Sequence, residues 1–434
     1  MTVKFRVYFW LAWVLLGGIS ALLGAETDST WQQWRGPKRN GQYEGTAWPK
    51  ELNKENFRQE WKIQLASSYS SPVADKEKVY TTESLPTGKE QVTAYHRATG
   101  KLAWSQSWDG SMKVPFFAAS NGSWIRSTPA LANDKLFVLG MQERLVCLDT
   151  RTGEKLWEMN IPEILQTPKP AFGGVSSPMI ANNALYVQAG GGIVKVDTYS
   201  GELIWASNRS NDAMNQSPFA SPRIHTLDGK EQIIALGRTS LAGLDPLNGE
   251  QLWDQDVPAF RGMNILTPTF IGNSILTATY GGKTHLFTPT RNPDKDWTIT
   301  ETWNQKFQGY MSNPIVIGKH AYLHGRSGRM VCLNTGTGEI NWTSSESLGK
   351  YCSMINQNDR ILVLSNNGKL RLLSANPNAY EVISSLEISD EDTWAHIAMA
   401  DQQIFIRSLN TLTTWHWENS NPPSSKTVAI ATKK

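Results

Sequence analysis

The stretch LDTRTGEKLW, residues 148–157, decides the fold of this chain, because close variants of it recur along the sequence. The variants are VDTYSGELIW at 196–205, LDPLNGEQLW at 244–253 and LNTGTGEINW at 333–342. The short polar side chains of such a stretch bond nearby backbone groups, and its Gly supplies a positive φ, so each copy predicts a tight turn. The hydrophobic residues on either side indicate that the turn joins two β-strands of one hairpin.

Each turn belongs to a longer repeat. Most copies open with Ser-Pro or Thr-Pro, continue through apolar runs such as KLFVLG and RLVCL, and end on a Trp. Neighbouring members of this Trp ladder are separated by 39 to 53 residues, and the ladder comprises Trp61, Trp104, Trp157, Trp205, Trp253, Trp303 and Trp342. Four short strands with their loops fill that spacing, which is typical of a propeller blade. We expect the Trp, on the outer fourth strand, to cover the gap between blades.

The two ends of the repeat array are complementary. The last copy, 394–417, supplies strand patterns such as QQIFIRSL but no fourth strand, whereas FRQEWKIQLA at 57–66 is a fourth strand without the first three. We therefore predict an all-β fold, an eight-bladed β-propeller of four-stranded antiparallel blades over 57–417. An N-terminal strand pairing with the C-terminal blade would close it and remove the open edge. Seven blades is the alternative, because the copy at 352–388 is degenerate.

The segments outside the repeats have separate roles. Residues 1–25 have a basic start, an apolar run over 7–23 and a small-residue end, which predicts a cleaved signal peptide. A retained anchor is the alternative, although the run is slightly short for a membrane span. We expect 26–56 to form an extension that packs on the propeller and 418–434 to be a disordered tail.

Charge and motifs exclude several classes of function. The formal net charge is +3, and Lys4 and Arg6 of the leader supply two of those charges, so there is no electrostatic case for nucleic acid as a partner. The sequence has no GxSxG, HExxH or phosphate-binding loop. Its three cysteines, Cys147, Cys332 and Cys352, are widely spaced and are expected to be small buried apolar residues.

The repeats resemble the pyrroloquinoline-quinone (PQQ) type of propeller, on LDTRTGEKLW and its variants together with openings such as STPAL and SSPMI. The resemblance covers about 57–417, and WQQWRGPKRNG at 31–41 resembles a segment that precedes many exported propellers of this kind. The family contains quinoprotein dehydrogenases and cofactor-free scaffolds of the BamB kind. The dehydrogenases hold the quinone against an adjacent Cys-Cys pair and a calcium ion. No two cysteines are adjacent here, so the resemblance favours a scaffold without cofactor or metal.

The candidate site lies in the long loops that enter the innermost strand of each blade, because such loops surround one mouth of a propeller channel. These loops are rich in aromatic, Asn and Arg residues, which suits a protein-binding surface. The candidate partner or ligand residues are Phe117, Asn121, Trp124, Arg126, Phe172, Asn215, Arg261, Asn264, Tyr310 and Asn313.

The sequence therefore predicts an exported, non-catalytic propeller scaffold of the bacterial cell envelope. The expected partner is an envelope or outer-membrane protein, with BamB-like outer-membrane protein assembly as the implied role. We expect a monomer that contacts the membrane only peripherally or through an uncleaved leader. The alternatives are a divergent PQQ-dependent dehydrogenase, which would need PQQ and calcium, and a carbohydrate-binding propeller.

Overall fold

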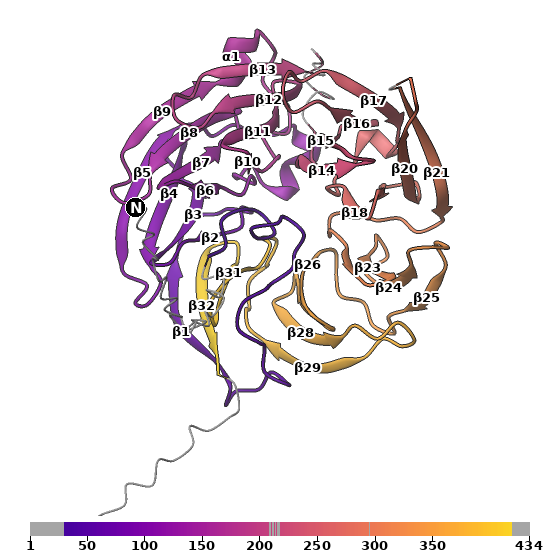
Figure 1. Cartoon of the computed structure of the whole chain (residues 1–434). Helices are drawn as coiled ribbons and strands as arrows, with labels where there is room; N and C mark the ends of the chain where they lie inside the picture. The colour runs from indigo at the N-terminus through magenta and orange to yellow at the C-terminus, as the bar shows by residue number, and fades with distance from the viewer. Residues whose placement is uncertain are drawn as a thin grey trace, which may run out of the picture.

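Each copy of the repeat folds into one four-stranded antiparallel sheet, and the sheets stand as blades around a central axis (Figure 1). The computed structural model describes residues 30–207, 210, 212, 214, 218–294 and 296–418. Within these residues, 32 strands form eight sheets. The predicted eight-bladed all-β propeller is confirmed, and the seven-blade alternative is wrong because the degenerate copy at 352–388 also forms a complete sheet, β26–β29. The predicted signal peptide at 1–25 lies outside the described residues, as does 419–434 of the predicted tail.

The blades are numbered here in chain order. Blade 1 comprises β2 (Val73–Ala74), β3 (Lys78–Ser84), β4 (Lys89–His96) and β5 (Leu102–Asp109), and blade 2 comprises β6 (Ala130–Ala132), β7 (Lys135–Leu139), β8 (Arg144–Asp149) and β9 (Lys155–Asn160). Blade 3 comprises β10 (Met179–Ala181), β11 (Ala184–Ala189), β12 (Gly192–Asp197) and β13 (Leu203–Ser207), and blade 4 comprises β14 (Arg223–Leu227), β15 (Lys230–Leu236), β16 (Ser240–Leu244) and β17 (Gln251–Asp256).

Blade 5 comprises β18 (Thr269–Ile271), β19 (Ser274–Ala278), β20 (Thr284–Arg291) and β21 (Trp297–Gln305), and blade 6 comprises β22 (Ile315–Ile317), β23 (His320–His324), β24 (Met330–Asn334) and β25 (Ile340–Thr343). Blade 7 comprises β26 (Cys352–Gln357), β27 (Arg360–Ser365), β28 (Lys369–Ser374) and β29 (Val382–Glu387), and blade 8 comprises β30 (Ala398–Ala400), β31 (Gln403–Arg407), β32 (Thr411–Trp417) and β1 (Phe57–Gln64). Helical structure in the described chain is limited to the short α1 (Ile161–Leu165) and the 3-10 turns η1 (Phe116–Asn121) and η2 (Phe260–Gly262).

The ring is closed by strands from opposite ends of the repeat array, as predicted. Strand β1 pairs antiparallel with β32, from Phe57 opposite Trp417 to Gln64 opposite Thr411. The pairing completes blade 8 and leaves β1 as its outer strand. The hydrophobic clusters lie mainly between neighbouring blades; one joins Phe137 and Cys147 of blade 2 to Leu185 of blade 3. Closure therefore gives blade 8 a neighbour on both faces, so it loses no inter-blade core.

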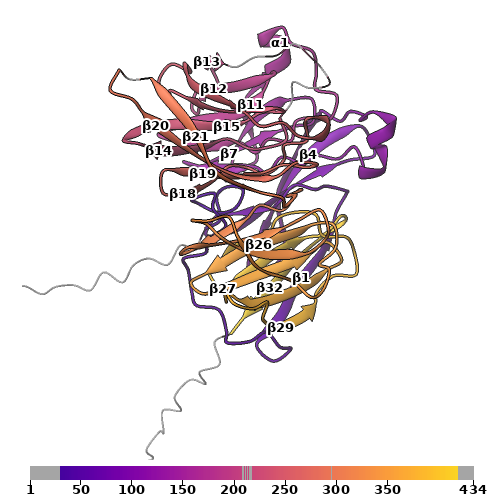
Figure 2. The same ribbon diagram turned by 90° about the vertical axis from the view of Figure 1, so that its right-hand side faces the viewer.

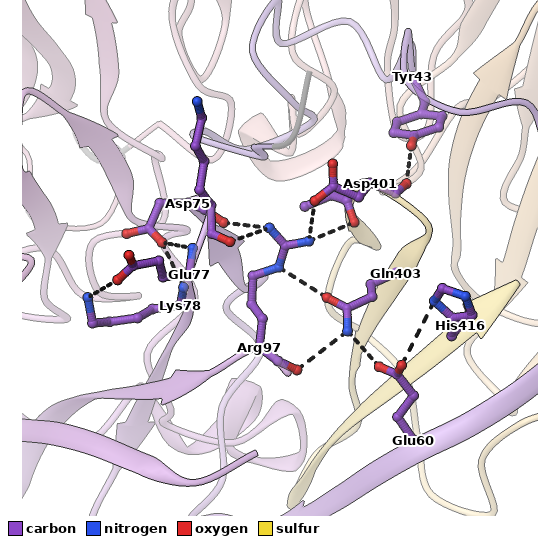
Figure 3. Close-up of polar contacts among 11 residues, drawn as sticks. Tyr43, Glu60, Asp75, Glu77, Lys78, Arg97, Asp401, Gln403 and His416 are labelled. Carbon is purple, nitrogen blue, oxygen red and sulfur yellow. Dashed lines mark hydrogen bonds and ion pairs between the residues drawn. The ribbon is translucent and has the colours of Figure 1, made fainter. Parts of the chain in front are cut away.

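A buried arginine fastens the first blade to the last at this junction (Figure 3). The Arg97 guanidinium donates from Nη1 to the Asp75 carbonyl at 2.8 Å and from Nη2 to the Ala400 carbonyl at 3.0 Å. Its Nη2 also lies 2.9 Å from the Asp401 carboxylate, and its Nε donates to Gln403 at 3.1 Å. Blade 1 carries Asp75 and Arg97, whereas Ala400, Asp401 and Gln403 belong to blade 8, so one side chain bridges the two ends of the ring.

The ladder Trp residues explain the Gly of the recurring turn. In blade 2, Gly153 has φ +77°, and a Cβ placed on it would lie 2.6 Å from the Trp104 ring of blade 1. The Trp104 indole N–H donates to the Thr150 carbonyl of the same turn at 2.9 Å. The same stacking of a Trp on the next blade's glycine joins Trp61 to Gly100, Trp157 to Gly201, Trp205 to Gly249 and Trp303 to Gly338. The Gly therefore provides both a positive φ and a flat seat for an indole.

Trp253 departs from this arrangement. The next blade replaces the glycine turn with the longer connection from Arg291 to Trp297, so no glycine seat is available. The Trp253 indole instead donates to Gln232 of its own blade at 2.7 Å and packs on Gly243, which pairs with it across the sheet. Trp253 therefore lacks the glycine contact, but it still lies in the hydrophobic cluster that joins blade 4 to Ile275 and Phe287 of blade 5.

The Ser/Thr-Pro openings also have a structural cause. The N–H of Ser71 donates to the Thr128 hydroxyl of the next blade at 3.2 Å, and the N–H of Thr128 donates to the Ser177 hydroxyl at 3.0 Å. The same type of bond connects Ser177 to Ser221 and Ser221 to Thr267. At the other end of the array, the Asn313 side-chain amide donates to the Thr267 carbonyl. The backbone N–H groups of Cys352, Ile397 and His396 donate to the hydroxyls of Ser312, Ser353 and Ser71, respectively. Hydroxyls thus link seven of the eight inter-blade junctions around the axis, and the Asn313 amide links the remaining junction, between blades 5 and 6.

Candidate functional site

The N-terminal segment 31–43 occupies the centre of the ring. Trp31 forms an antiparallel bridge with Ala74 of blade 1, and Gln42 forms a parallel bridge with Asn356 of blade 7. Between these points, the N–H of Leu131 in blade 2 donates to the Gln32 carbonyl at 2.8 Å. The segment appears as the indigo coil at the centre of Figure 1, and it continues beside blades 7 and 8 toward β1. We call residues 31–43 the plug.

Two buried arginines anchor the plug to backbone carbonyls of the surrounding blades. Arg35 Nη2 donates to the Pro314 carbonyl at 2.7 Å, and Arg39 Nη1 donates to the Pro178 carbonyl at 2.7 Å. Both side chains are buried, and burial together with the nearby Arg223 lowers the pKa of each guanidinium to about 9. A pKa of about 9 leaves both groups charged at neutral pH. The prolines of the repeat openings therefore contribute carbonyl acceptors to the channel wall.

Aromatic contacts complete the packing of the plug. The guanidinium carbons of Arg35 and Arg39 each lie 5.7 Å from the Trp34 ring centroid, within range of a cation–π interaction. The Trp34 ring also meets His396 edge-on at 6.2 Å. Burial, followed by the charge of Arg35, lowers the pKa of His396 to about 3. The imidazole is consequently neutral at physiological pH.

The charge at the channel centre does not fit a calcium-assisted quinone site. Arg35, Arg39 and Arg223 place positive charge there, and a calcium ion needs several converging oxygen ligands, usually including carboxylates. Among the residues that the structure describes, no group of three His, Cys, Asp or Glu side chains could hold a metal ion. The three cysteines are buried and unpaired in the separate strands β8, β24 and β26, so they form no Cys-Cys pair for a quinone.

An arc of aromatic rings follows the loops that enter the innermost strands. Phe116 and Phe117 of η1 lie edge-on with ring centroids 5.6 Å apart, and Phe117 lies 6.1 Å from Phe172 of the next such loop. Phe172 in turn lies 5.8 Å from Phe219. The Arg238 guanidinium lies over Phe219 at 4.2 Å and over Phe172 at 5.6 Å. The arc thus crosses blades 2 to 4 without a break.

The arc continues across blades 5 and 6. The Arg261 guanidinium lies over Phe260 at 5.2 Å, and Phe260 lies 5.8 Å from Tyr280. Tyr280 meets Tyr310 at 4.7 Å and carries the Arg326 guanidinium at 4.6 Å. We call this set the mouth rim: Phe116, Phe117, Phe172, Phe219, Arg238, Phe260, Arg261, Tyr280, Tyr310 and Arg326.

Four of the ten predicted site residues belong to the mouth rim, namely Phe117, Phe172, Arg261 and Tyr310. Arg126 lies just inside it and donates from Nη2 to the Gly122 carbonyl at 2.7 Å. Trp124 lies outside the rim, beside the seam between blades 8 and 1.

Two of the predicted asparagines are buried and hydrogen-bond to backbone carbonyls instead of facing solvent. Asn264 is buried and its amide donates to the Val257 carbonyl at 2.7 Å, whereas buried Asn313 donates to the Thr267 carbonyl at 3.0 Å. Asn215 lies outside the described residues, and the backbone of Asn121 ends η1.

Sequence reasoning missed Arg238, Tyr280 and Arg326 because it considered only one class of loop. These three residues sit in the turns between the second and third strands of blades 4, 5 and 6. In an antiparallel blade those turns emerge on the same face as the loops that enter the innermost strand. Strand alternation alone could therefore have located them.

Known proteins resemble this chain in sequence and in fold. A family model described as "Outer membrane protein assembly factor BamB" matches residues 88–344. The BamB protein of Yersinia pestis is 23% identical over 250 residues, which cover 56% of this chain and 59% of that protein. Across the three curated relatives the matched part spans 52% to 64% of their own length.

Solved structures share the fold. BamB from Moraxella catarrhalis aligns with a TM-score of 0.59 at 16% identity, covering 83% of this chain and 98% of that one. Quinohemoprotein alcohol dehydrogenase from Comamonas testosteroni aligns with a TM-score of 0.61 at 12% identity, covering 89% and 80%. Likeness at such identities establishes the fold alone. Because the family match extends over more than half of the sequence, the chain belongs to the family of outer membrane protein assembly factor BamB.

Proposed function

We propose that this protein is a non-catalytic scaffold of the bacterial cell envelope that binds a component of outer-membrane protein assembly through its mouth rim. The family match and the BamB relatives support this role. The observation that carries the proposal is the exposed aromatic surface of the rim. Phe116, Phe117 and Phe260 are 90%, 55% and 52% exposed, and exposed aromatic groups of this size are typical of interaction sites.

The composition of the rim indicates the chemistry of the partner. Aromatic and arginine side chains are the residues that most often dominate binding free energy at protein interfaces. Two arginines of the rim, Arg261 and Arg326, are exposed, so the rim favours a partner segment that combines apolar and acidic side chains. The rigid ring presents these groups without needing to fold on binding, which lowers the entropic cost of association.

Export of the chain is part of the same proposal. An assembly role requires a leader that delivers the chain to the envelope, as proposed for residues 1–25, and a monomeric propeller is sufficient for it. The described residues contain no helix that is long and apolar enough to span a membrane. In the proposed role, membrane contact is peripheral or through the leader.

The proposal is tested by site-specific photo-crosslinking in growing cells. A benzophenone amino acid at Phe116 should crosslink to an outer-membrane assembly component, and the double variant Phe116→Ser/Phe117→Ser should lower the yield of crosslinks from Phe260 about tenfold. The matched control is Tyr199, which is 81% exposed in the glycine turn of blade 3, on the opposite face of the ring. Equal crosslinking from both positions, or crosslinks only to unrelated proteins, would contradict the proposal.

A further inference from the structure

A cleft of about 700 Å³ lies on the mouth face at the seam where the ring closes. Its walls come from three places: the residues after β1 and the β31–β32 turn of blade 8, the β3–β4 turn of blade 1, and the loop that leads from blade 1 to blade 2. Its volume is within the range of small-molecule sites. The exposed phenylalanines of the mouth rim do not line the cleft, so its role does not depend on the proposed partner surface.

One wall of the cleft is an indole held in a fixed orientation. Gly122 has φ +70°, and a Cβ placed on it would lie 2.3 Å from the Trp124 ring, so the glycine backbone covers one side of that ring. Tyr69 meets the Trp124 ring edge-on at 5.2 Å and an interplanar angle of 82°. Trp124 is nevertheless only half-buried and lines the cleft. A rigid, partly exposed ring of this kind is a preformed stacking surface.

The polar groups of the cleft can donate hydrogen bonds to a ligand. The Ser84 hydroxyl accepts the Ile125 N–H at 2.9 Å, and the Ser123 hydroxyl accepts the Val114 N–H at 3.1 Å. Each of these oxygens accepts one N–H and still carries its own proton, so each hydroxyl can donate to a ligand. The hydroxyl of Ser67 donates to the side-chain oxygen of Asn410 at 2.8 Å, so that the amide group of Asn410 offers its N–H donors.

The charge of the cleft also favours a ligand with acceptor groups. The exposed ammonium group of Lys113 also lines the cleft, whereas none of the lining residues is a carboxylate. Donors that converge beside an aromatic ring select a ligand with an apolar face and acceptor substituents. A pyranose ring has such a face in its C–H groups, and an acetamido or carboxylate substituent supplies the acceptors.

We propose that this cleft binds a saccharide that carries acceptor substituents, with the sugar ring stacked on Trp124 and its acetamido or carboxylate oxygens facing Ser84, Ser123 and Asn410. A polysaccharide of the cell envelope with acetamido or acidic groups has this chemistry. The site gives the scaffold a second ligand at a place separate from the mouth rim.

The test measures binding to the full-length protein by isothermal titration calorimetry with three probes: tri-N-acetylchitotriose, an oligoglucuronate and cellotriose. We expect at least one of the first two to bind about tenfold more tightly than cellotriose, which has hydroxyls but no acetamido or carboxylate group. Equal affinity for all three probes, or no binding by any, would overturn the proposal. Binding of inorganic phosphate with the affinity of the oligosaccharides would also overturn it, because the site would then recognise an anion alone.

Variants of the cleft residues distinguish a loss of saccharide stacking from a loss of protein stability. Trp124→Ala should weaken saccharide binding about tenfold or more, whereas Trp124→Phe should retain most of the affinity because it keeps a stacking ring. Asn410→Asp has the same shape but replaces the amide donors with acceptors, so it should weaken binding to a similar extent. Unchanged affinity in Trp124→Ala and Asn410→Asp, with melting temperatures like that of the parent, would contradict the assignment.

A control distinguishes this proposal from the proposed function. Phe116→Ser lies in the same loop as Trp124 but outside the cleft, and it should leave saccharide affinity unchanged while reducing partner crosslinking. Loss of crosslinking with normal saccharide binding would support both proposals, whereas loss of saccharide binding in Phe116→Ser would contradict the location of the site.

Discussion

At the scale of single residues, the recurring turn shows why its glycine and the ladder Trp occur together. Gly153 and Gly229 have nearly the same positive φ, +77° and +76°, but their surroundings differ. A Cβ on Gly153 would meet the Trp104 ring at 2.6 Å, whereas a Cβ on Gly229 would have nothing within 4 Å. The two positions therefore separate backbone strain from loss of the indole seat.

We expect Gly229→Ala to lower the free energy of unfolding by about 1 kcal/mol, the cost of a left-handed backbone for an L-residue. Gly153→Ala carries the same cost and also displaces Trp104, which adds about 1–3 kcal/mol. Urea unfolding followed by circular dichroism measures both changes. Equal losses in the two variants would show that Trp stacking contributes nothing at this turn.

At the scale of elements, the closing strand and the buried arginine beside it carry the junction between first and last blades. The Arg97 guanidinium bonds three backbone carbonyls, those of Asp75, Lys76 and Ala400, in addition to the Asp401 carboxylate. Its side chain is only 6% exposed, whereas that of Asp401 is 46% exposed. The carbonyl bonds therefore matter more than the ion pair, which solvent weakens.

Arg97→Ala should lower the free energy of unfolding by about 2 kcal/mol or more, because it leaves buried carbonyls without donors. The matched control is Lys38→Ala, which removes an exposed ion pair with Glu44 and should cost less than about 0.5 kcal/mol. Denaturant titrations of the three proteins give the comparison. A loss in Arg97→Ala no larger than in Lys38→Ala would show that the arginine does not hold the seam.

At the scale of the whole molecule, the blades and the plug pack together into one ring, which Figure 2 shows turned by 90° from the view of Figure 1. His396 beside the plug and His324 in blade 6 are both buried. Burial lowers the pKa of His396 to about 3 and that of His324 to about 4. Unfolding restores an ordinary pKa of about 6.5, so the unfolded chain binds the additional protons at mildly acidic pH.

The free energy of unfolding should consequently fall as the pH is lowered from about 6.5 toward 5, at up to about 1.4 kcal/mol per pH unit for each histidine. Buried Glu90 opposes this trend, because burial raises its pKa and the folded state then holds its proton more tightly. His396→Gln should reduce the slope of the unfolding free energy against pH by the contribution of about one proton taken up on unfolding. Denaturant unfolding at pH 6.0, 5.5 and 5.0 measures this slope. An unchanged slope would show that His396 does not titrate on unfolding.

The sequence by itself determined the blade and its repetition. The turn LDTRTGEKLW, the apolar alternation and the Trp ladder act within some 50 residues, so local propensity and period are enough to specify a sheet and its neighbours. The complementary ends 57–66 and 394–417 then predicted closure and eight blades, which β1 and β32 confirm.

Only the tertiary structure decided where the plug lies and which side chains share a surface. Arg39 binds the Pro178 carbonyl and Ser67 binds Asn410, pairs far apart in the chain, and a backbone carbonyl has no signature in the sequence. For the same reason the predicted Asn264 and Asn313 hydrogen-bond to backbone carbonyls, while Trp124 lines the seam cleft rather than the mouth rim. Contacts between distant segments depend on the geometry of the closed ring, which no single repeat encodes.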